Sequence, residues 1–594
     1  MHKLFLELKE KHVYRAGAAY AVAAWVLLQL FNNVAPILEL PAWVGRVVLL
    51  VLVLGFPLTL AVAWMRAPAE GAAAQRKIGA LDWSLLGALI VVIALVSYQQ
   101  LSSALGGRAS QQQASSLSIA VLPFANVSGD SNQEFFSDGM TDEIMAALAK
   151  VPDLRVVARS SAFQFKAQNR DLRAIGQALS ARYLIDGSVR KAGNRVRITA
   201  QLVQADNGVG IWTNNYDREL TDVFAIQEDI AQSIASALKV PLGLKQGDSL
   251  VRDRTENLES YDQYLRAKAL VRARSIPDAI KLLEAVVARD PGFASGWGLL
   301  AQADQLLLAF SPGLRNGPLN ETRAFVQSSL GSAERAAREA IRLDPKNADA
   351  YGTLANVLGL QGKWLESHEL YRQALASDST EAEVLQEYSL TRASGGYLKD
   401  ALSSREKLRA LEPFVPIYNI RTAEILEITG QRQAAIPILE AIPANAAGGF
   451  YRNVALARAY AAEGRYAEAA DTLLLITGDL VSRRSVEDAA RLLRGAPTKA
   501  TAPENLPALE GELNFVYAHV GALDRTLEFA ERSIQMGWHE AFGLKIFWLP
   551  EYAPVRKTER FKTLVRNARL VEYWRAKGWP DLCKPVGADD FACE

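Results

Sequence analysis

The apolar residues of this chain change their spacing twice, and each change marks a new region. Long unbroken apolar runs come first, short β-branched runs follow between residues 118 and 240, and helical spacing begins near residue 255. Each long run has about the length that crosses ~30 Å of hydrocarbon, so we predict a membrane anchor with three transmembrane helices over residues 1–105. The three runs are residues 16–38, 43–65 and 83–101.

Basic residues predict how this anchor is oriented. The link between the first two runs carries only Arg46, whereas the N-terminus and the second link are richer in lysine and arginine. The positive-inside rule then places the N-terminus in the cytoplasm and the residues after about 105 in the periplasm of a bacterial inner membrane. A two-span anchor with the opposite sidedness is the alternative. The basic flanking residues are Lys3, Lys9, Lys11, Arg15, Arg66, Arg76 and Lys77.

A polar stretch at residues 106–117 predicts a flexible linker. Residues 118–240 then predict a small α/β domain, with strands at 118–124 and 154–159, helices between, and a long stretch that alternates in period two. We expect the order β-α-β-α-β-β-β-α and a mixed sheet with helices on one face. Four acidic residues near the first helix could bind a cation, but the favoured interpretation is that they cap the helix start and complement its dipole. They are Glu134, Asp138, Asp142 and Glu143.

Several segments of this domain resemble the N-terminal domain type of the TolB-like family. They are IAVLPFANVSGD, FFSDGMTDEI, ARYLIDGSVRKAGNRVRITAQLV and WTNNYDREL, and they occur in the family's order over about 120 residues. Related proteins often join this domain to tetratricopeptide repeats, and some begin with an adenylate cyclase domain or a DNA-binding winged helix. Only about fifteen residues precede the first apolar run here, so we expect neither cyclase activity nor DNA binding.

A strict 34-residue repeat between residues 349 and 464 organises the predicted solenoid, which spans residues 255–480. A period of 34 with two helix-length blocks indicates stacked helical hairpins, in which small residues permit close helix crossing and a glycine ends the first helix. This register resembles the tetratricopeptide repeat, and we predict six units in an all-α solenoid. The repeated columns are Gly362, Gly396, Gly430, Gly464; Ala355, Ser389, Ala423, Ala457; and Ser367, Ala401, Ala435, Ala469.

Prolines extend this register towards the N-terminus. Pro291 and Pro345 close second helices but lie 54 residues apart, so we predict an insertion around residues 306–321. Beyond the array, residues 481–594 predict a degenerate repeat at 511–537 followed by a C-terminal cap and tail.

First helices line the concave face of such arrays, so residues beside the first small column predict a binding groove. The predicted set is neither uniformly basic nor uniformly acidic, and an ordinary solvated groove is the alternative. Repeat arrays of this kind bind other polypeptides through many weak contacts. The candidate groove residues are Asp349, Asn356, Glu383, Gln386, Leu390, Glu424 and Arg458.

The tail is rich in aromatic residues and contains both cysteines of the chain. We interpret the aromatics, from Phe547 to Trp579, as a cover for the last hairpin, with an aromatic docking patch as the alternative. Cys583 and Cys593 lie ten residues apart across turn-forming residues, and a periplasmic location permits a disulfide between them. Two free thiols are the other possibility.

Composition and motifs give no indication of catalysis. The net charge of +1 does not indicate a nucleic-acid surface, and no phosphate-binding glycine loop, HExxH motif or GxSxG motif occurs. We therefore expect no enzymatic activity, no cofactor and no metal. Our hypothesis is a membrane-anchored periplasmic scaffold or sensor that binds a protein or peptide. The rivals are a regulatory remnant of a signalling protein without its output domain, and an enzyme with an unrecognised site on the α/β domain.

Overall fold

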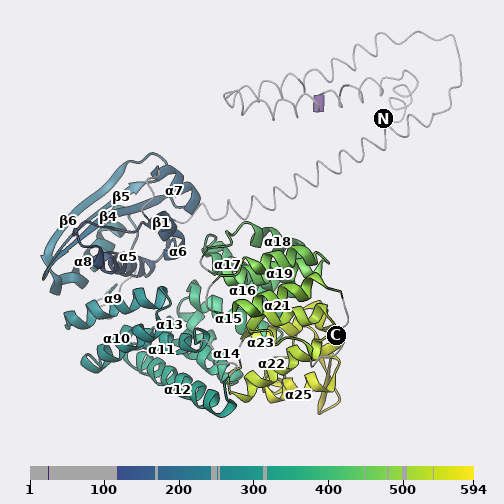
Figure 1. Cartoon of the computed structure of the whole chain (residues 1–594). Helices are drawn as coiled ribbons and strands as arrows, with labels where there is room; N and C mark the ends of the chain where they lie inside the picture. The colour runs from purple at the N-terminus through teal and green to yellow at the C-terminus, as the bar shows by residue number, and fades with distance from the viewer. Residues whose placement is uncertain are drawn as a thin grey trace, which may run out of the picture. The chain divides into compact units, whose positions relative to one another are not determined.

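The computed structural model describes residues 117–594 with short gaps, and of the N-terminal part it describes Tyr20, Ala24, Trp25 and Leu52. Apart from these four residues, the predicted spans and the linker up to residue 116 lie outside the described residues. Among the residues that are described, no helix has both the length and the hydropathy that a membrane crossing requires. Residues 112–594 form one unit (Figure 1). Its gaps are residues 167–170, 243–249, 252–254, 312–316, 447, 478–479, 498–504 and 540.

One mixed sheet forms the centre of the α/β domain. Its strand order is β3-β1-β4-β5-β6, and the short strand β2 also pairs with β4. β1 pairs in parallel with β3 and β4, whereas β4, β5 and β6 form an antiparallel ladder. The strands are β1 (Leu117–Val121), β2 (Ala125–Asn126), β3 (Leu154–Val156), β4 (Tyr183–Ala192), β5 (Arg195–Gln204) and β6 (Gly210–Glu219).

Helices cover both faces of this sheet, which corrects the prediction of helices on one face. α5 (Glu134–Ala149) and α8 (Val223–Ala237) pack in one core with Ile119, whereas α7 (Leu172–Leu179) packs in another core with Ala120 (Figure 1). Both residues belong to β1, and successive side chains of a strand point to opposite faces. Because β1 is apolar at consecutive positions, both faces of the sheet require a cover.

The α/β domain and the first repeat share one hydrophobic core. In α9 (Leu258–Arg272), the hydroxyl of Tyr261 accepts a hydrogen bond of 2.9 Å from Gln227 Nε2, and its ring lies edge-on to Phe224. Gly139 of α5 lies so close to α9 that a Cβ there would be 2.7 Å from Leu265 Cδ2. The α/β domain therefore packs directly on the N-terminal end of the solenoid.

The acidic residues of α5 form ion pairs and do not cap the helix. The helix begins at Glu134 and follows a short 3-10 turn whose N-cap is Asp130. The remaining acidic residues therefore lie within the helix and face neighbouring cations, which corrects the capping interpretation. The pairs are Glu134 and Asp138 with Lys166, Asp142 with Arg159 and Arg272, and Glu143 with Lys268.

Six helix pairs, from α9 to α20, form the tetratricopeptide array. The four glycines of the repeat adopt left-handed backbone with φ between +73° and +83°, and both small-residue columns are 0% exposed. The predicted register is therefore confirmed. The further helices are α10 (Ile276–Arg289), α11 (Ala294–Ala309), α12 (Leu319–Leu343), α13 (Ala348–Leu360), α14 (Trp364–Ser377), α15 (Ala382–Ser394), α16 (Leu398–Leu411), α17 (Pro416–Ile428), α18 (Arg432–Glu440), α19 (Gly449–Ala462) and α20 (Tyr466–Leu474).

The predicted insertion between Pro291 and Pro345 includes part of a long helix. α12 has 25 residues, whereas α14 and α16 have 14 each. After the array, α21 (Arg483–Arg494) precedes the degenerate unit, in which a 3-10 helix, η6 (Gly511–His519), replaces the first α-helix and α22 (Leu523–Gln535) forms the second.

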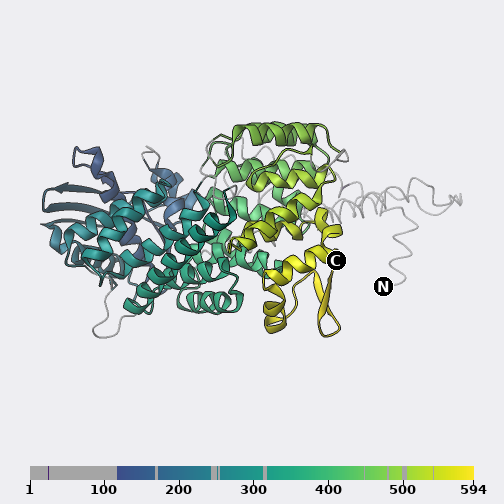
Figure 2. The same cartoon turned by 60° about the horizontal axis from the view of Figure 1, so that its bottom comes forward.

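Residues 541–594, which we name the C-terminal segment, fold back onto the middle of the array. Figure 2 shows this segment in yellow beside the green helices. Its elements are α23 (Ala541–Lys545), η7 (Ile546–Trp548), η8 (Pro550–Tyr552), α24 (Ala553–Arg556), α25 (Glu559–Asn567), α26 (Leu570–Lys577), β7 (Cys583–Val586) and β8 (Asp590–Cys593).

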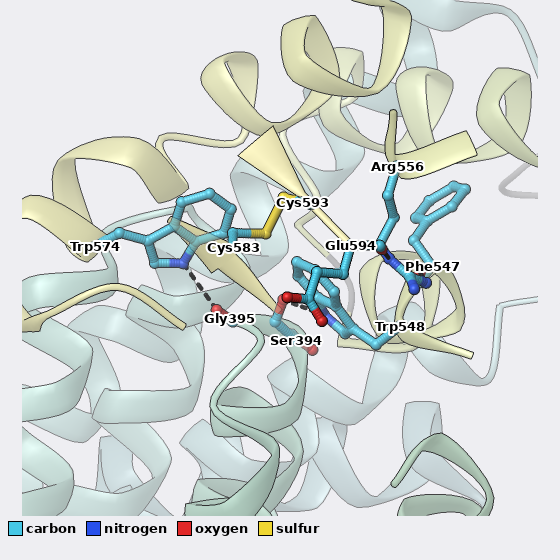
Figure 3. The surroundings of a disulfide bond; sticks show 9 residues. All are labelled: Ser394, Gly395, Phe547, Trp548, Arg556, Trp574, Cys583, Cys593 and Glu594. Atoms are coloured by element: carbon cyan, nitrogen blue, oxygen red, sulfur yellow. Dashed lines mark hydrogen bonds between the residues drawn. A yellow bond between two sulfur atoms is a disulfide. The ribbon is translucent and has the colours of Figure 1, made fainter. Parts of the chain in front are cut away.

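The aromatic residues of this segment cover the last hairpin, where Tyr552 OH lies 3.4 Å from Thr526 Oγ1 of α22, and they also pack on a repeat turn in the middle of the array, which was not predicted. The indole nitrogen of Trp574 donates to the carbonyl oxygen of Gly395 at 2.8 Å, and that of Trp548 donates to Ser394 at 3.2 Å (Figure 3). The turn glycine, Gly396, permits this approach because a Cβ there would lie 2.9 Å from the Trp548 ring. A disulfide joins Cys583 to Cys593 across the β7–β8 hairpin (Figure 3).

Candidate functional site

The concave face of the solenoid contains a groove of ≈ 1620 Å³. The first helices α11, α13, α15 and α17 line it, and so does a segment of the α/β domain made of α6 (Arg159–Ala162) and η2 (Phe163–Phe165). Because one wall comes from the α/β domain, the groove depends on how that domain sits against the array. Five of the seven predicted groove residues line it, namely Asp349, Asn356, Glu383, Gln386 and Leu390.

Four carboxylates from two neighbouring repeats meet in this groove. Asp349 lies in the first turn of α13, Glu381 is the N-cap residue of α15, and Glu383 and Glu387 lie one turn apart on α15. Asp349 and Glu383 are exposed to the groove, and the other two are half-buried. Among the described residues, none of the four carboxylates forms an ion pair with a lysine, arginine or histidine. The floor of the groove therefore carries negative charge that the protein does not neutralise directly.

The protein environment raises the pKa of three of these carboxyl groups. Desolvation by the groove walls, together with the charge of Glu383, raises the pKa of Asp349 to about 6 and that of Glu387 to about 7. The charge of Asp349 and then desolvation raise the pKa of Glu381 well above its usual range. Like charges in a partly enclosed space disfavour one another's ionised form. A positively charged group placed among them would relieve this repulsion.

Three of the basic residues that line the groove are paired with acidic residues of α5. Arg159 and Arg272 both bind the carboxylate of Asp142, and Lys268 Nζ lies 3.1 Å from Glu143 Oε1. These cations therefore stabilise the junction between the α/β domain and α9 rather than the groove floor. Apolar side chains flank the carboxylates and include Val384, Leu390, Phe414, Ile417 and Phe450.

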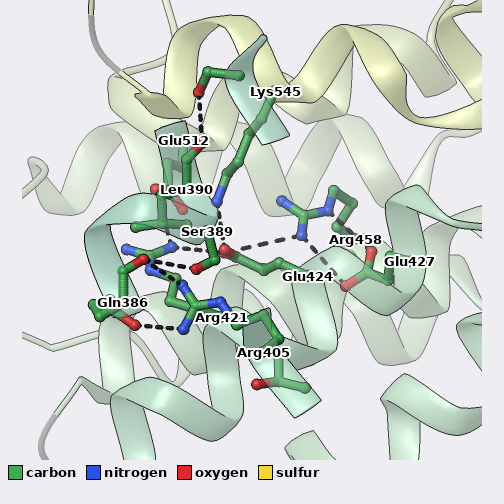
Figure 4. Close-up of polar contacts among 12 residues, drawn as sticks. Gln386, Ser389, Leu390, Arg405, Arg421, Glu424, Glu427, Arg458, Glu512 and Lys545 are labelled. Carbon is green, nitrogen blue, oxygen red and sulfur yellow. Dashed lines mark hydrogen bonds and ion pairs between the residues drawn. The ribbon is translucent and has the colours of Figure 1, made fainter. Parts of the chain in front are cut away.

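Glu424 and Arg458 do not line the groove, although the sequence predicted it. Glu424 is 0% exposed and Arg458 is 7% exposed, because the C-terminal segment covers the first helices that carry them. Lys545 of that segment binds Glu424, whose other oxygen lies 2.7 Å from Arg421 Nη1 (Figure 4). Arg458 Nε in turn donates to Glu427 at 3.0 Å. The solenoid's concave surface is thus divided into an open groove and a covered ion network.

Opposing influences act on the pKa values inside this network. Burial opposes the ionisation of Glu424, but Arg421, Lys545 and Arg458 outweigh burial and hold its pKa well below the usual range. Burial lowers the pKa of Lys545 to about 8 against the attraction of Glu424. Glu424 is therefore the anion that holds the surrounding cations in place, and Lys545 joins the C-terminal segment to the array.

The groove residues predicted from the sequence do not include Glu381, Glu387 or the α6–η2 wall. Glu387 follows the predicted residue Glu383 by one helical turn, so extending the first-helix pattern by one turn would have found it. Glu381 lies in the loop before α15, outside the helical pattern. The α6–η2 segment carries no repeat signal, because its position depends on the fold of another domain.

Comparisons with known proteins agree with this architecture in part. Residues 114–234 match the family described as HilA/YgeH-like transcriptional regulator, second domain, and residues 336–369 match the tetratricopeptide repeat. Putative adenylate cyclase 3 of Rhizobium meliloti is 35% identical over 244 residues, which are 41% of this chain and 40% of that protein. The type IV pilus assembly protein PilF of Pseudomonas aeruginosa is 34% identical over 96 residues, 15% of this chain and 36% of that protein.

The chain thus aligns with two fifths or less of the length of these curated relatives. Among solved structures, a thermophilic tetratricopeptide protein of Thermus thermophilus aligns with 34% of this chain and 94% of its own, at 21% identity and a TM-score of 0.24. The repeat match and the stacked helix pairs show that this chain contains an array of tetratricopeptide repeats. Its α/β domain is similar to the second domain of HilA-like regulators and belongs to the part of the chain that precedes the repeats.

Proposed function

We propose that this protein binds an extended, positively charged polypeptide segment in the groove of its repeat array. The observation that carries the proposal is the set of four carboxylates in the groove floor, which form no ion pair with the described residues. Lysine or arginine side chains of a partner would neutralise them. Apolar residues such as Val384 and Ile417 would contact the partner's aliphatic side chains.

The raised pKa values predict how this binding depends on pH. A cationic partner favours the ionised form of Asp349 and Glu387, so binding releases protons when these groups are still protonated. The affinity should therefore rise as the pH increases through about 6 to 7, and level off once both groups are ionised in the free protein. Salt should weaken the affinity, because exposed charges are screened.

Peptides of opposite charge test the proposal directly. Fluorescence anisotropy is measured with a labelled decapeptide of alternating lysine and alanine, and with one of alternating glutamate and alanine. We expect binding of the lysine peptide only, and the double variant Glu383→Gln/Glu387→Gln should weaken it by at least about tenfold, or about 1.4 kcal/mol.

Glu406→Gln is the matched control, because Glu406 is an exposed glutamate on the second helix α16. This variant should bind like the unaltered protein. Equal affinity for both peptides, or equal loss in the control and the double variant, would refute the proposed selectivity.

We further propose that residues 1–105 are a membrane anchor, that residues 118–240 are a TolB-like domain, and that the array works in the periplasm. The three apolar runs and the distribution of basic residues support this location. The disulfide between Cys583 and Cys593 is also typical of an oxidising compartment. Alkaline phosphatase fused after residue 300 should be active and green fluorescent protein at the same point should be dark. The opposite pair of results would place the array in the cytoplasm.

A regulatory role is the second candidate function. The similarity to a putative adenylate cyclase and to a HilA-like transcriptional regulator favours it, and the HilA-like match covers the α/β domain. In this case the chain senses a partner and a separate protein supplies the output. Deleting residues 1–80 should then abolish a response that the groove variants also abolish. A response that survives both changes would exclude this role.

A further inference from the structure

The α6–η2 segment touches the solenoid at a second place, far from the shared core with α9. Ser161 Oγ donates a hydrogen bond of 2.9 Å to Glu412 Oε2, and Ser160 Oγ lies 3.4 Å from the same oxygen. The side-chain amide of Gln164 donates to the carbonyl oxygen of Phe414. We name these five residues the clasp. Glu412 and Phe414 lie in the turn between α16 and α17, so the clasp joins the α/β domain to that turn and completes a ring of elements around the groove.

The two contacts of the α/β domain differ greatly in extent. The junction with α9 has a continuous apolar core and several ion pairs, including those of Asp142 with Arg272 and of Lys191 with Asp262. The clasp consists of a few side-chain hydrogen bonds, and residues from both of its sides line the groove. A local opening breaks the contact with fewer interactions first. Opening of this ring would therefore begin at the clasp while the junction with α9 stays intact.

We infer that the clasp is a gate, which opens at the contact of Ser161 with Glu412 to admit an extended polypeptide and closes over it. This inference rests on the proposed function of the groove. A ring without a gate would admit a partner only by threading of a free end. A ring with a gate also admits an internal segment of a longer chain.

Glu412 makes this gate sensitive to pH. Its side chain is 2% exposed, and among the described residues its polar partners are the hydroxyls of Ser160 and Ser161, with no ion pair. The nearby charged group on α15 is the like-charged Glu383, and the neighbouring titratable group on α17 is Tyr418. On α6, the cation of Arg159 binds Asp142 instead. A buried carboxylate with these surroundings is more stable when protonated.

The direction of the effect follows from the two states of Glu412. Burial raises its pKa in the closed gate from 4.5 to about 7, although the serine hydroxyls oppose the shift. In the open gate the carboxyl group is hydrated and its pKa returns to the ordinary value. The closed gate therefore binds the proton more tightly and is favoured at low pH. The equilibrium constant between the closed and the open gate therefore falls by about two orders of magnitude as the pH rises from about 4.5 to about 7. Above that pH the constant no longer changes.

Spin-label distances test the gate without any peptide. Labels are placed at Gln177→Cys on α7 and Ala434→Cys on α18, both exposed positions, and the two native cysteines do not react because they are bonded to each other. We expect one narrow distance at pH 5 and an added longer distance at pH 8. Glu412→Gln should keep the narrow distance at both pH values, because the neutral amide oxygen still accepts the serine hydroxyls.

Ser161→Ala supplies the second variant, since it weakens the clasp and should show the longer distance already at pH 5. Identical distance distributions at pH 5 and pH 8 in the unaltered protein would overturn the inference. So would a pH response of Glu412→Gln that equals that of the unaltered protein. Circular dichroism confirms that each variant is folded.

Association kinetics with the alternating lysine peptide then connect the gate to the groove. In stopped-flow measurements at pH 6, Glu412→Gln should bind at least several-fold more slowly than the unaltered protein, and Ser161→Ala should bind faster. Equal rates in all three proteins would contradict the gate. If no peptide binds at all, the proposed function fails, while the spin-label distances still decide whether the clasp opens.

Discussion

Glu424 is the residue whose replacement most directly tests the covered ion network. Its side chain is 0% exposed, one oxygen lies 2.7 Å from Arg421 Nη1 and 4.0 Å from Arg458 Nη2, and the other binds Lys545. Glu424→Gln keeps the shape but removes the charge, so Lys545 and Arg421 lose their buried ion pairs with Glu424, while Arg458 keeps its pair with Glu427. Breaking a buried ion pair in this way costs about 3–5 kcal/mol. The Lys545 contact should fail first, because it joins two separate parts of the chain.

Urea unfolding measures this loss of stability. The unfolding is monitored by the fluorescence of the tryptophans in the C-terminal segment. The double variant Glu424→Gln/Lys545→Met should recover part of the stability, because it also removes the buried cation that has lost its ion pair with Glu424. We expect a coupling energy of about 1–3 kcal/mol between the two sites. Strictly additive effects would refute the reasoning, since independent sites show no coupling.

An exposed ion pair provides the control for this experiment. Glu487 lies 3.0 Å from Arg483 on α21, and both side chains are more than half exposed, at 59% and 55%. Glu487→Gln should change the free energy of unfolding by less than about 1 kcal/mol, because water already solvates both charges. A loss as large as that of Glu424→Gln would show that burial is not the cause.

Three further predictions concern the C-terminal segment and the groove. Gly430→Ala should cost about 1–2 kcal/mol of left-handed backbone strain, whereas Gly396→Ala should cost at least about 1 kcal/mol more in urea unfolding, because its Cβ would meet the C-terminal segment. Replacing Cys583 and Cys593 by serine should lower the stability by about 2–3 kcal/mol, and a reducing agent should have no further effect on that variant. Binding of the alternating lysine peptide to Glu387→Gln should depend less on pH between 6 and 8 than binding to the unaltered protein; an unchanged profile would exclude Glu387 as a contributor.

The sequence predicted the repeat array well because the repeat is a local property. Gly362, Gly396 and the buried columns recur at a fixed interval, and each repeat contacts mainly its neighbours. The same logic placed Asp349 and Glu383 in the groove, since first helices line the concave face. It did not predict that Glu424 is covered, because the covering residue, Lys545, lies 121 residues further along the chain.

In the α/β domain, too, local features could be predicted from the sequence and long-range contacts could not. The succession of its strands and helices could be read from periodicity, but the position of α7 on the second face depended on how the sheet was covered. The carboxylates of α5 looked like helix caps, and their partners Arg272 and Lys268 belong to the solenoid. Residue type and spacing do not reveal such partners when they lie on different domains.

The sequence by itself thus determined the repeat, its small and turn positions, and the succession of elements in the sheet, because each rests on residues within a few turns of one another. The tertiary structure alone decided which part of the concave face stays open. That outcome depends on two long-range contacts, the C-terminal segment on the turn at Gly396 and the α6–η2 segment on Glu412. Contacts between distant residues leave no period in the sequence, so only the folded chain brings them together.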